Sequence, residues 1–127
     1  SGEFSKTISE ADVNAFAEVS GDKNPVHVDA EFAATSIFGQ RISHGMLVAG
    51  VISAVFGYHF PGPGWIYVNQ SLKFKAPVFL GDTVTAVVTA TKLIPEKQMI
   101  EFDTVVSVGD KVVIDGTALL MSPRRPK

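Results

Sequence analysis

The sequence contains no cysteine among its 127 residues, which excludes disulfides, thiolate metal sites and thiol nucleophiles. Charged residues are also scarce, at 19%, and a net charge of −2 gives no broad basic surface for nucleic acid. The longest apolar run, residues 47–56, is about half the length of a membrane-spanning helix. No basic region followed by an apolar run opens the sequence. We therefore expect a cytoplasmic protein that binds neither nucleic acid nor membrane.

The composition that remains is that of an ordinary globular domain, with 46% hydrophobic residues. A chain of this length buries roughly two-thirds of its unfolded surface, which is enough for one core. We therefore expect residues 1–127 to form a single domain.

The first quarter of the chain predicts a strand followed by a helix. Apolar and polar residues alternate over residues 4–8, which favours a short strand. Ser9 lies three residues before Asp12, a spacing typical of a capping signal. Apolar residues at helical spacing follow over 13–20, and Gly21 is a natural helix stop.

The next segment predicts an ordered loop and two helices. Residues 21–29 (GDKNPVHVD) are rich in turn formers and indicate a loop. Residues 30–35 predict a short helix. Residues 43–60 are apolar on nearly every face, which is typical of a helix buried all round. The sequence Pro61-Gly62-Pro63-Gly64 ends it.

The second half alternates with period two and predicts antiparallel strands. Alternation over residues 66–76 ends at Pro77, and Gly109-Asp110 is typical of a tight hairpin. The other expected strands are 83–92, 97–108 and 111–121. Such a sheet needs one covered face, and the 43–60 helix is the obvious cover. The predicted fold class is therefore α+β, with a curved antiparallel sheet wrapped around a buried central helix.

Asp22 and His27 are the first candidates for chemistry. They lie five residues apart, with Asn24-Pro25 between them on a bent segment. Pro25 fixes its own φ and biases Asn24 toward an extended conformation. A carboxylate and an imidazole aimed at one small volume supply the proton-handling groups of general acid–base catalysis. The alternative is that Asp22 caps a turn and His27 is an ordinary surface residue.

The step Ser43-His44-Gly45 opens the predicted central helix. If Ser43 caps that helix, Gly45 lies in its first turn, where backbone N–H groups have no intrahelical partner. Those groups carry partial positive charge and can receive a developing oxyanion. The alternative is that Gly45 only relieves crowding against the sheet. His44 is a second base or, as we prefer, a packing or hydrogen-bonding residue.

Two more polar residues are weaker candidates. Ser53 lies eight residues beyond Gly45, on roughly the same side of the predicted helix. It is a supporting candidate for bonding a substrate or Asp22, although a buried serine often bonds the carbonyl four residues earlier. His59 is isolated, and we expect a structural or exposed role for it. No nucleophile elbow, phosphate-binding glycine loop or His-x-x-x-His metal pair is visible.

Together these segments resemble the MaoC-like (R)-specific enoyl-CoA hydratase family. The matching residues are Phe16-Ala17, the run from Ser20 to Asp29, Phe32-Ala33, Phe38, Ile42, His44-Gly45-Met46-Leu47, Ile66-Tyr67, Gln70-Ser71-Leu72, Phe74, Pro77-Val78 and Gly81-Asp82. The similarity covers most of the chain. The Asp-x-Asn-Pro-x-His segment followed by His-Gly-Met is highly specific, with no departure at the motif positions.

The resemblance implies a single hot-dog domain, a homodimer as the minimal unit and no cofactor beyond the thioester substrate. It implies reversible hydration of trans-2-enoyl-CoA to (R)-3-hydroxyacyl-CoA. By this analogy Asp22 and His27 hold one water, the Gly45 N–H bonds the thioester oxygen, and Ser53 assists. Candidate contacts for an anionic coenzyme A or acyl carrier protein, weighed against ordinary surface charge, are Arg41, Lys73, Lys75, Arg124 and Arg125.

Three other functions stay open from the sequence. The first is dehydration of 3-hydroxyacyl chains on acyl carrier protein, which is the same chemistry reversed. The second is an acyl-CoA thioesterase, because one fold hosts many functions. The third is a non-catalytic module that binds acyl thioesters or assembles with a partner.

Overall fold

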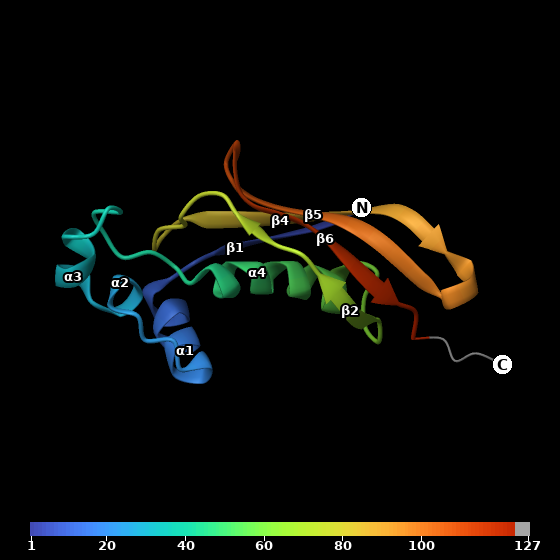
Figure 1. Cartoon of the computed structure of the whole chain (residues 1–127), viewed down its shortest axis with the longest axis horizontal. Helices are drawn as coiled ribbons and strands as arrows, with labels where there is room; N and C mark the ends of the chain where they lie inside the picture. Colours follow the sequence, from blue (N-terminus) through green and yellow to red (C-terminus); the bar gives the residue numbers. More distant parts are fainter. Residues whose placement is uncertain (124–127) are drawn as a thin grey trace.

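The computed structural model describes residues 1–123, in which a curved antiparallel sheet lies over one long helix (Figure 1). The strands are β1 (Gly2–Thr7), β2 (Ile66–Gln70), β3 (Lys73–Phe74), β4 (Thr83–Ile94), β5 (Met99–Val108) and β6 (Lys111–Met121). The helices are α1 (Glu10–Ser20), α2 (Pro25–Val28), α3 (Ala30–Ala34) and α4 (Gly45–Ala54), which continues as a π-helical turn (Val55–His59). A 3₁₀ turn (Pro95–Lys97) joins β4 to β5.

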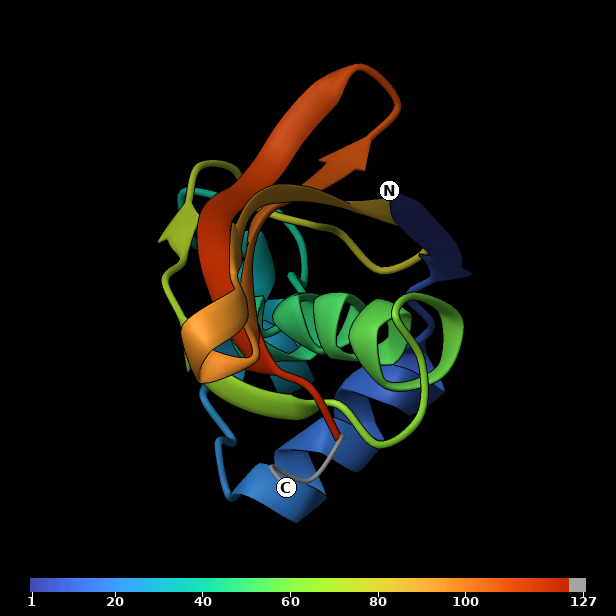
Figure 2. The same cartoon turned by 90° about the vertical axis from the view of Figure 1, so that its right-hand side faces the viewer.

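The sheet has the strand order β1-β4-β5-β6-β2, with β3 paired to β6, and every pairing is antiparallel. Viewed from the end, it curls around α4, while α1, α2 and α3 gather beyond one end of the sheet (Figures 1 and 2). The expected curved sheet around a central helix is therefore confirmed. The Gly109-Asp110 hairpin is also confirmed, because Val108 pairs with Lys111 across it.

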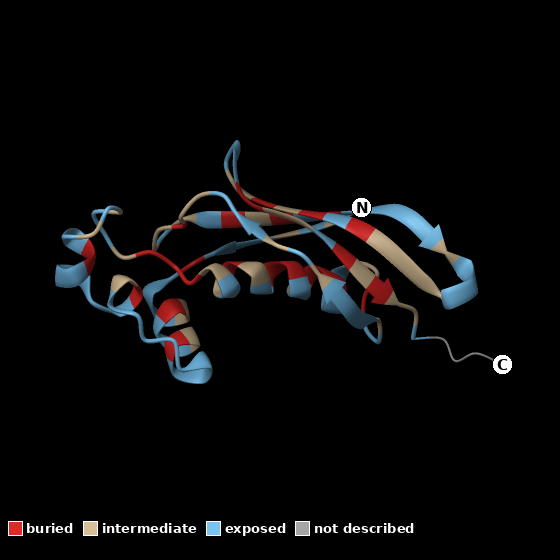
Figure 3. Cartoon of the chain, in the orientation of Figure 1, coloured by how far each residue is buried: buried red, intermediate tan, exposed pale blue. Residues whose placement is uncertain are grey.

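The core lies between α4 and the concave face of the sheet (Figure 3). Inward-facing residues recur at every second position in the first half of β4, as the pleat requires. Each large apolar side chain buried in this way contributes about 1.5–3 kcal/mol of transfer free energy. The buried residues include Val48, Val51, Ile52, Val55 and Phe56 on the helical side, with Val84, Ala86, Val88, Phe102, Val106, Val113, Ile114, Ala118 and Leu120 on the strands.

The expected 43–60 helix differs from the observed one in its start, its end and its burial. It begins at Gly45 and changes to π-helical geometry at Val55. Burial all round is wrong for this chain, because one face remains exposed and carries Met46, Gly50 and Ser53. Apolar composition alone did not reveal that only one side of the helix faces the sheet.

The expected strand over 66–76 is also divided in two. The pairing of β2 with β6 shifts between Tyr67 and Asn69, and β3 begins only at Lys73. The chain between them stays beside β6 and approaches it closely at Gly116, where an added Cβ would lie 1.9 Å from the Ser71 carbonyl oxygen. Glycine at this position therefore permits the close approach, which the alternating pattern did not indicate.

The helix α1 is fixed at its start by the predicted capping signal. Ser9 Oγ accepts from the Asp12 N–H at 3.1 Å, and Asp12 accepts from the Ser9 N–H at 3.0 Å. The latter bond is the main cause that lowers the pKa of Asp12, and Lys6 at 3.2 Å from the carboxylate also lowers it. This capping box sets where α1 begins.

We expect Ser9→Ala to lower the free energy of unfolding by about 1 kcal/mol, measured by urea denaturation. Asp12→Asn tests the charge. Because the folded pKa of Asp12 is lowered, its carboxylate stabilises the fold above its unfolded pKa of about 3.9, and this is lost as the pH falls through the folded value. The stability difference from wild type should therefore be larger at about pH 6 than at about pH 3. An equal difference at both would contradict the role of the charge.

Candidate active site

Asp22 is presented by the short loop that follows α1. The helix ends at Gly21, which adopts the left-handed conformation with φ of 81° and donates its N–H to the Ala17 carbonyl. The Asp22 N–H then donates to Ser20 Oγ at 3.1 Å, and Asp22 Oδ1 accepts from the Asn24 N–H at 3.2 Å. The exposed carboxylate is therefore oriented by the backbone of its own loop.

His27 lies on α2, a single helical turn inside the segment that was expected to be a loop. Asn24 caps it by accepting from the Val26 N–H at 3.1 Å, and Pro25 occupies its first position. The expected loop is therefore wrong for residues 25–28. The reason is that an Asn-Pro pair, which favours turns, is equally suited to begin a helix.

The His27 ring is held in one tautomer by its hydrogen bond. Nδ1 lies 2.8 Å from the Ile42 carbonyl oxygen, and a carbonyl can only accept, so Nδ1 carries the proton. In the neutral ring Nε2 then keeps an unshared lone pair, which is what a general base requires. The side chain is buried at 9% exposure and lines the cavity described below.

Arg41 braces this turn against α1. Its Nε donates to the His27 carbonyl at 2.6 Å, while its two terminal nitrogens bind Glu10 at 2.6 Å and Asn14 at 2.9 Å. The side chain is only 12% exposed. The expectation that Arg41 is a contact for an anionic carrier therefore needs correction, because the guanidinium is used within the fold.

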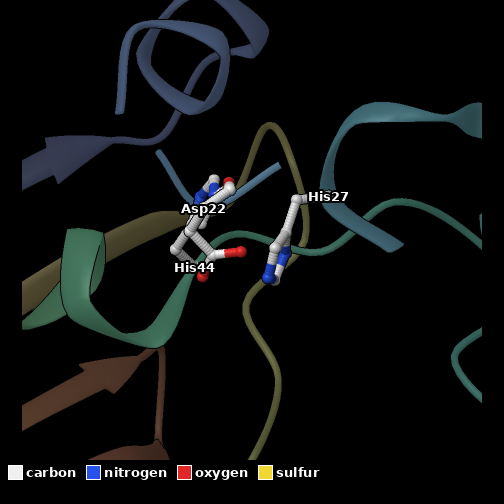
Figure 4. A group of neighbouring side chains, drawn as sticks. All are labelled: Asp22, His27 and His44. Atoms are coloured by element: carbon white, nitrogen blue, oxygen red, sulfur yellow. Dashed lines mark hydrogen bonds between the residues drawn. The ribbon is translucent and has the colours of Figure 1, made fainter. Parts of the chain in front are cut away.

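The loop, α2 and the segment before α4 bring Asp22, His27 and His44 together (Figure 4). One carboxylate oxygen and one nitrogen of each ring lie within 4.8 Å of one another. The carboxylate of Asp22 is turned toward the His27 ring (Figure 4). The predicted convergence of Asp22 and His27 is therefore found, and His44 joins them.

The two imidazoles are stacked, with centroids 4.0 Å apart and planes inclined by 28°. An imidazole binds a metal along a lone pair in its ring plane. Rings stacked in this way direct their lone pairs side by side instead of toward one point. The cluster is therefore better suited to hydrogen bonding a water than to ligating an ion.

A cavity of about 570 Å³ opens beside the cluster, which is the size of a small-molecule site. Asp22, His27, His44 and Gly45 all border it. Most of the remaining wall is apolar and comes from Phe16, Phe38, Met46, Val48, Phe74, Val78 and Ile114. The cavity therefore joins a polar corner to an apolar slot.

Gly45 begins α4 at the edge of this cavity. A Cβ here would lie 2.6 Å from the Phe74 ring, so any larger residue would require that ring to shift. Its N–H, at the first helical position, has no acceptor among the described residues. Ser43 does not cap the helix as expected. The cap residue is His44, and Ser43 instead donates its N–H to the carbonyl of Val78, in the segment before β4, at 2.7 Å.

Ser53 is not brought to the cavity. It is exposed on the outer face of α4 and is absent from the lining residues. At 3.6 residues per turn, eight residues leave it about 80° around the helix from Gly45, so the two do not share a face. His59 is exposed and stacks on Phe4 at 4.8 Å, as expected of a residue outside the site.

Of the expected basic contacts, Lys75 lines the cavity and lies 3.8 Å from Asp115. Lys73 is exposed next to it on β3. Arg124 and Arg125 lie outside the described residues.

The sequence predicted a packing or hydrogen-bonding role for His44. Both are found, since Nε2 lies 2.8 Å from the Asp22 carbonyl and the ring stacks on His27. No local pattern indicated that contact across 22 positions.

The chain is similar in sequence and in fold to known hydratases and dehydratases. The chain is 58% identical over 125 residues to an (R)-specific enoyl-CoA hydratase of Rhodospirillum rubrum, covering 98% of this chain and 87% of the relative. It is 49% identical over 120 residues to a 3-hydroxybutyryl-CoA dehydratase of Methylorubrum extorquens, covering 94% and 76%. The solved (R)-hydratase from Aeromonas caviae, involved in PHA biosynthesis, superposes with a TM-score of 0.90 at 43% identity, covering 94% and 91%.

The α+β hot-dog architecture expected from the sequence is confirmed by this structural match. The family model described as MaoC like domain matches residues 2–114, which is most of the chain. The chain therefore belongs to the MaoC-like domain family.

Proposed function

We propose that this chain, working as one MaoC-like domain, is an (R)-specific hydratase that converts trans-2-enoyl-CoA to (R)-3-hydroxyacyl-CoA reversibly. The observation that carries this proposal is the arrangement of three groups at one cavity: the Asp22 carboxylate, the Nε2 of His27 and the N–H of Gly45. Neither nitrogen has a hydrogen-bond partner among residues 1–123. The names of the relatives support the reaction, and those named (R)-specific enoyl-CoA hydratase support its stereochemistry.

In this mechanism Asp22 and His27 hold one water by its two hydrogens. Both groups are acceptors, since the carboxylate offers oxygens and His27 offers the Nε2 lone pair. With its hydrogens engaged, the water directs an oxygen lone pair at C3 of the substrate. The water oxygen bonds to C3, and one of its protons stays on the new hydroxyl. Asp22 and His27 pass the other proton to C2 on the same face. Such positioned proton transfer contributes roughly 10²–10⁴ in rate.

The electrons of the double bond move onto the thioester as water adds, so negative charge develops on the thioester oxygen. The Gly45 N–H, at the positive end of α4, is the donor that receives it. One oriented donor of this kind is worth about 3–4 kcal/mol. The apolar wall formed by Met46, Val48 and Ile114 would hold the acyl chain. This chemistry calls for neither a metal nor a redox cofactor.

The expectations about carrier contacts, the homodimer, Ser53 and cellular location are kept here as further proposals. The remaining described candidates for contact with an anionic carrier are Lys75, which lines the cavity, and the exposed Lys73 two residues before it. The homodimer stays a prediction that sedimentation tests. The half-exposed Ile66 and Val68 on the edge strand β2 are apolar surface that a second copy would cover.

The supporting role of Ser53 and the cytoplasmic location also stay predictions. No helix among residues 1–123 is long and apolar enough to span a membrane.

Incubation with crotonyl-CoA distinguishes the proposed hydratase from a thioesterase. We expect loss of the conjugated double bond without release of free thiol, with (R)-3-hydroxybutyryl-CoA as the product by chiral chromatography. Release of thiol at the rate of substrate loss would identify a thioesterase instead, and no reaction would favour a binding module. A parallel assay with crotonyl acyl carrier protein shows which carrier is preferred.

Substitution of the pair tests its part in the chemistry. Asp22→Asn keeps the bond from the Asn24 N–H, and His27→Asn keeps a donor near Nδ1 for the Ile42 carbonyl, so both should fold. Each should lower kcat for crotonyl-CoA at least about 10²-fold, because a proton-handling group is lost.

Matched controls are Asp110→Asn and His59→Ala, which change exposed residues outside the cavity and should leave kcat unchanged. Near-normal hydration by both Asp22→Asn and His27→Asn would remove the pair from the mechanism.

A further inference from the structure

His44 is buried at 2% exposure, directly before α4, and no step of the proposed reaction uses it. Its Nε2 lies 2.8 Å from the Asp22 carbonyl oxygen, which can only accept, so Nε2 carries the proton. This bond joins the loop that presents the carboxylate to the first residues of α4.

The other ring nitrogen of His44 argues against a role in packing alone. Nδ1 is buried and has no partner among the described residues. A buried acceptor without a partner costs about 1–3 kcal/mol. An apolar side chain of similar size would fill the same space without that cost. The presence of an imidazole here is therefore explained by its other nitrogen, Nε2, which donates to the Asp22 carbonyl.

The position of His44 at the helix start gives a second reason. Residues that cap helices usually turn their side chains onto the first backbone N–H groups. His44 makes no such bond, because its ring reaches across to Asp22 and lies against His27. The N–H of Gly45 and its neighbours is thereby left available at the cavity.

We propose that His44 is a positioning residue, which fixes the Asp22–His27 pair at a set distance from the Gly45 N–H through its hydrogen bond to the Asp22 carbonyl. This role rests on the proposed hydratase function. The water is held by the loop, while the thioester oxygen is held by α4. The reacting atoms C3 and C2 lie between those two anchors, so a loose junction would misplace the water and lower kcat more than it weakens substrate binding.

Two substitutions of nearly equal size separate the donor from the packing. The amide nitrogen of His44→Gln falls close to the position of Nε2 and retains a donor for the Asp22 carbonyl. His44→Met fills the same space without one. We expect His44→Met to lower kcat for crotonyl-CoA by about 10–100-fold with KM changed less than about threefold, and His44→Gln to recover most of that loss.

A third variant separates positioning from stability. His44→Asn is a favoured helix cap, so α4 should be as stable as in wild type or more so. Its amide is one atom shorter than Nε2 requires, and it competes for the backbone N–H groups at the cavity. We expect thermal unfolding at or above the wild-type temperature together with a kcat as low as that of His44→Met. This variant retains the test even if His44→Met folds poorly.

Equal losses of kcat in His44→Gln and His44→Met would overturn the proposal. A loss of kcat that parallels the drop in unfolding temperature across the variants would also overturn it, as would a change in KM with kcat unaltered. The wild-type assay separates the two levels of inference. A wild-type protein that hydrates crotonyl-CoA, with His44 variants that do so equally well, removes only the positioning role. A wild-type protein without hydratase activity removes the proposed function and this role with it.

Discussion

The hydrogen bond between His27 Nδ1 and the Ile42 carbonyl is the constraint on which the site depends. It fixes the tautomer of the imidazole and leaves Nε2 as the only nitrogen able to accept a proton. The carbonyl that receives it belongs to a residue bridged to Phe79 beside the sheet, so the ring is anchored to the fold. Arg41 secures the same turn from the other side by binding the His27 carbonyl and two residues of α1.

The helix α4 combines a structural role with a chemical one. Its inner face closes the core against the sheet, which accounts for its apolar sequence. The helix begins at the cavity, and no side chain caps its first turn. The positive end of the helix dipole is therefore available to a ligand. Gly45 leaves room for the Phe74 ring, and its N–H has no acceptor among residues 1–123. In the proposed mechanism this residue therefore serves both the packing of the fold and the binding of the thioester oxygen.

Much of the fold could be predicted from the sequence because its signals are local. The capping pair Ser9 and Asp12, the stop at Gly21 and the Gly109-Asp110 hairpin depend on neighbouring residues alone. The outer face of α4 and the close backbone approach at Gly116 could not be predicted. Both depend on where distant segments lie, and neither alternation nor composition records that.

The candidate site divides in the same way. The bend between Asp22 and His27 was visible as a motif, and the resemblance to a known family identified it. The links of His44 to Asp22 and of Arg41 to α1 join residues 22 or more positions apart, so no local pattern could predict them. For Ser53 the spacing gave only an approximate position, because eight residues place it about 80° around the helix from Gly45.

A crystal structure of Asp22→Asn with bound (R)-3-hydroxybutyryl-CoA tests the central claim most directly, because product and catalytic groups are then seen together. The account predicts the 3-hydroxyl oxygen within about 3 Å of His27 Nε2 and of the side chain at position 22, with the thioester oxygen about 3 Å from the Gly45 nitrogen. A hydroxyl remote from His27, or a thioester oxygen bound away from the start of α4, would contradict it.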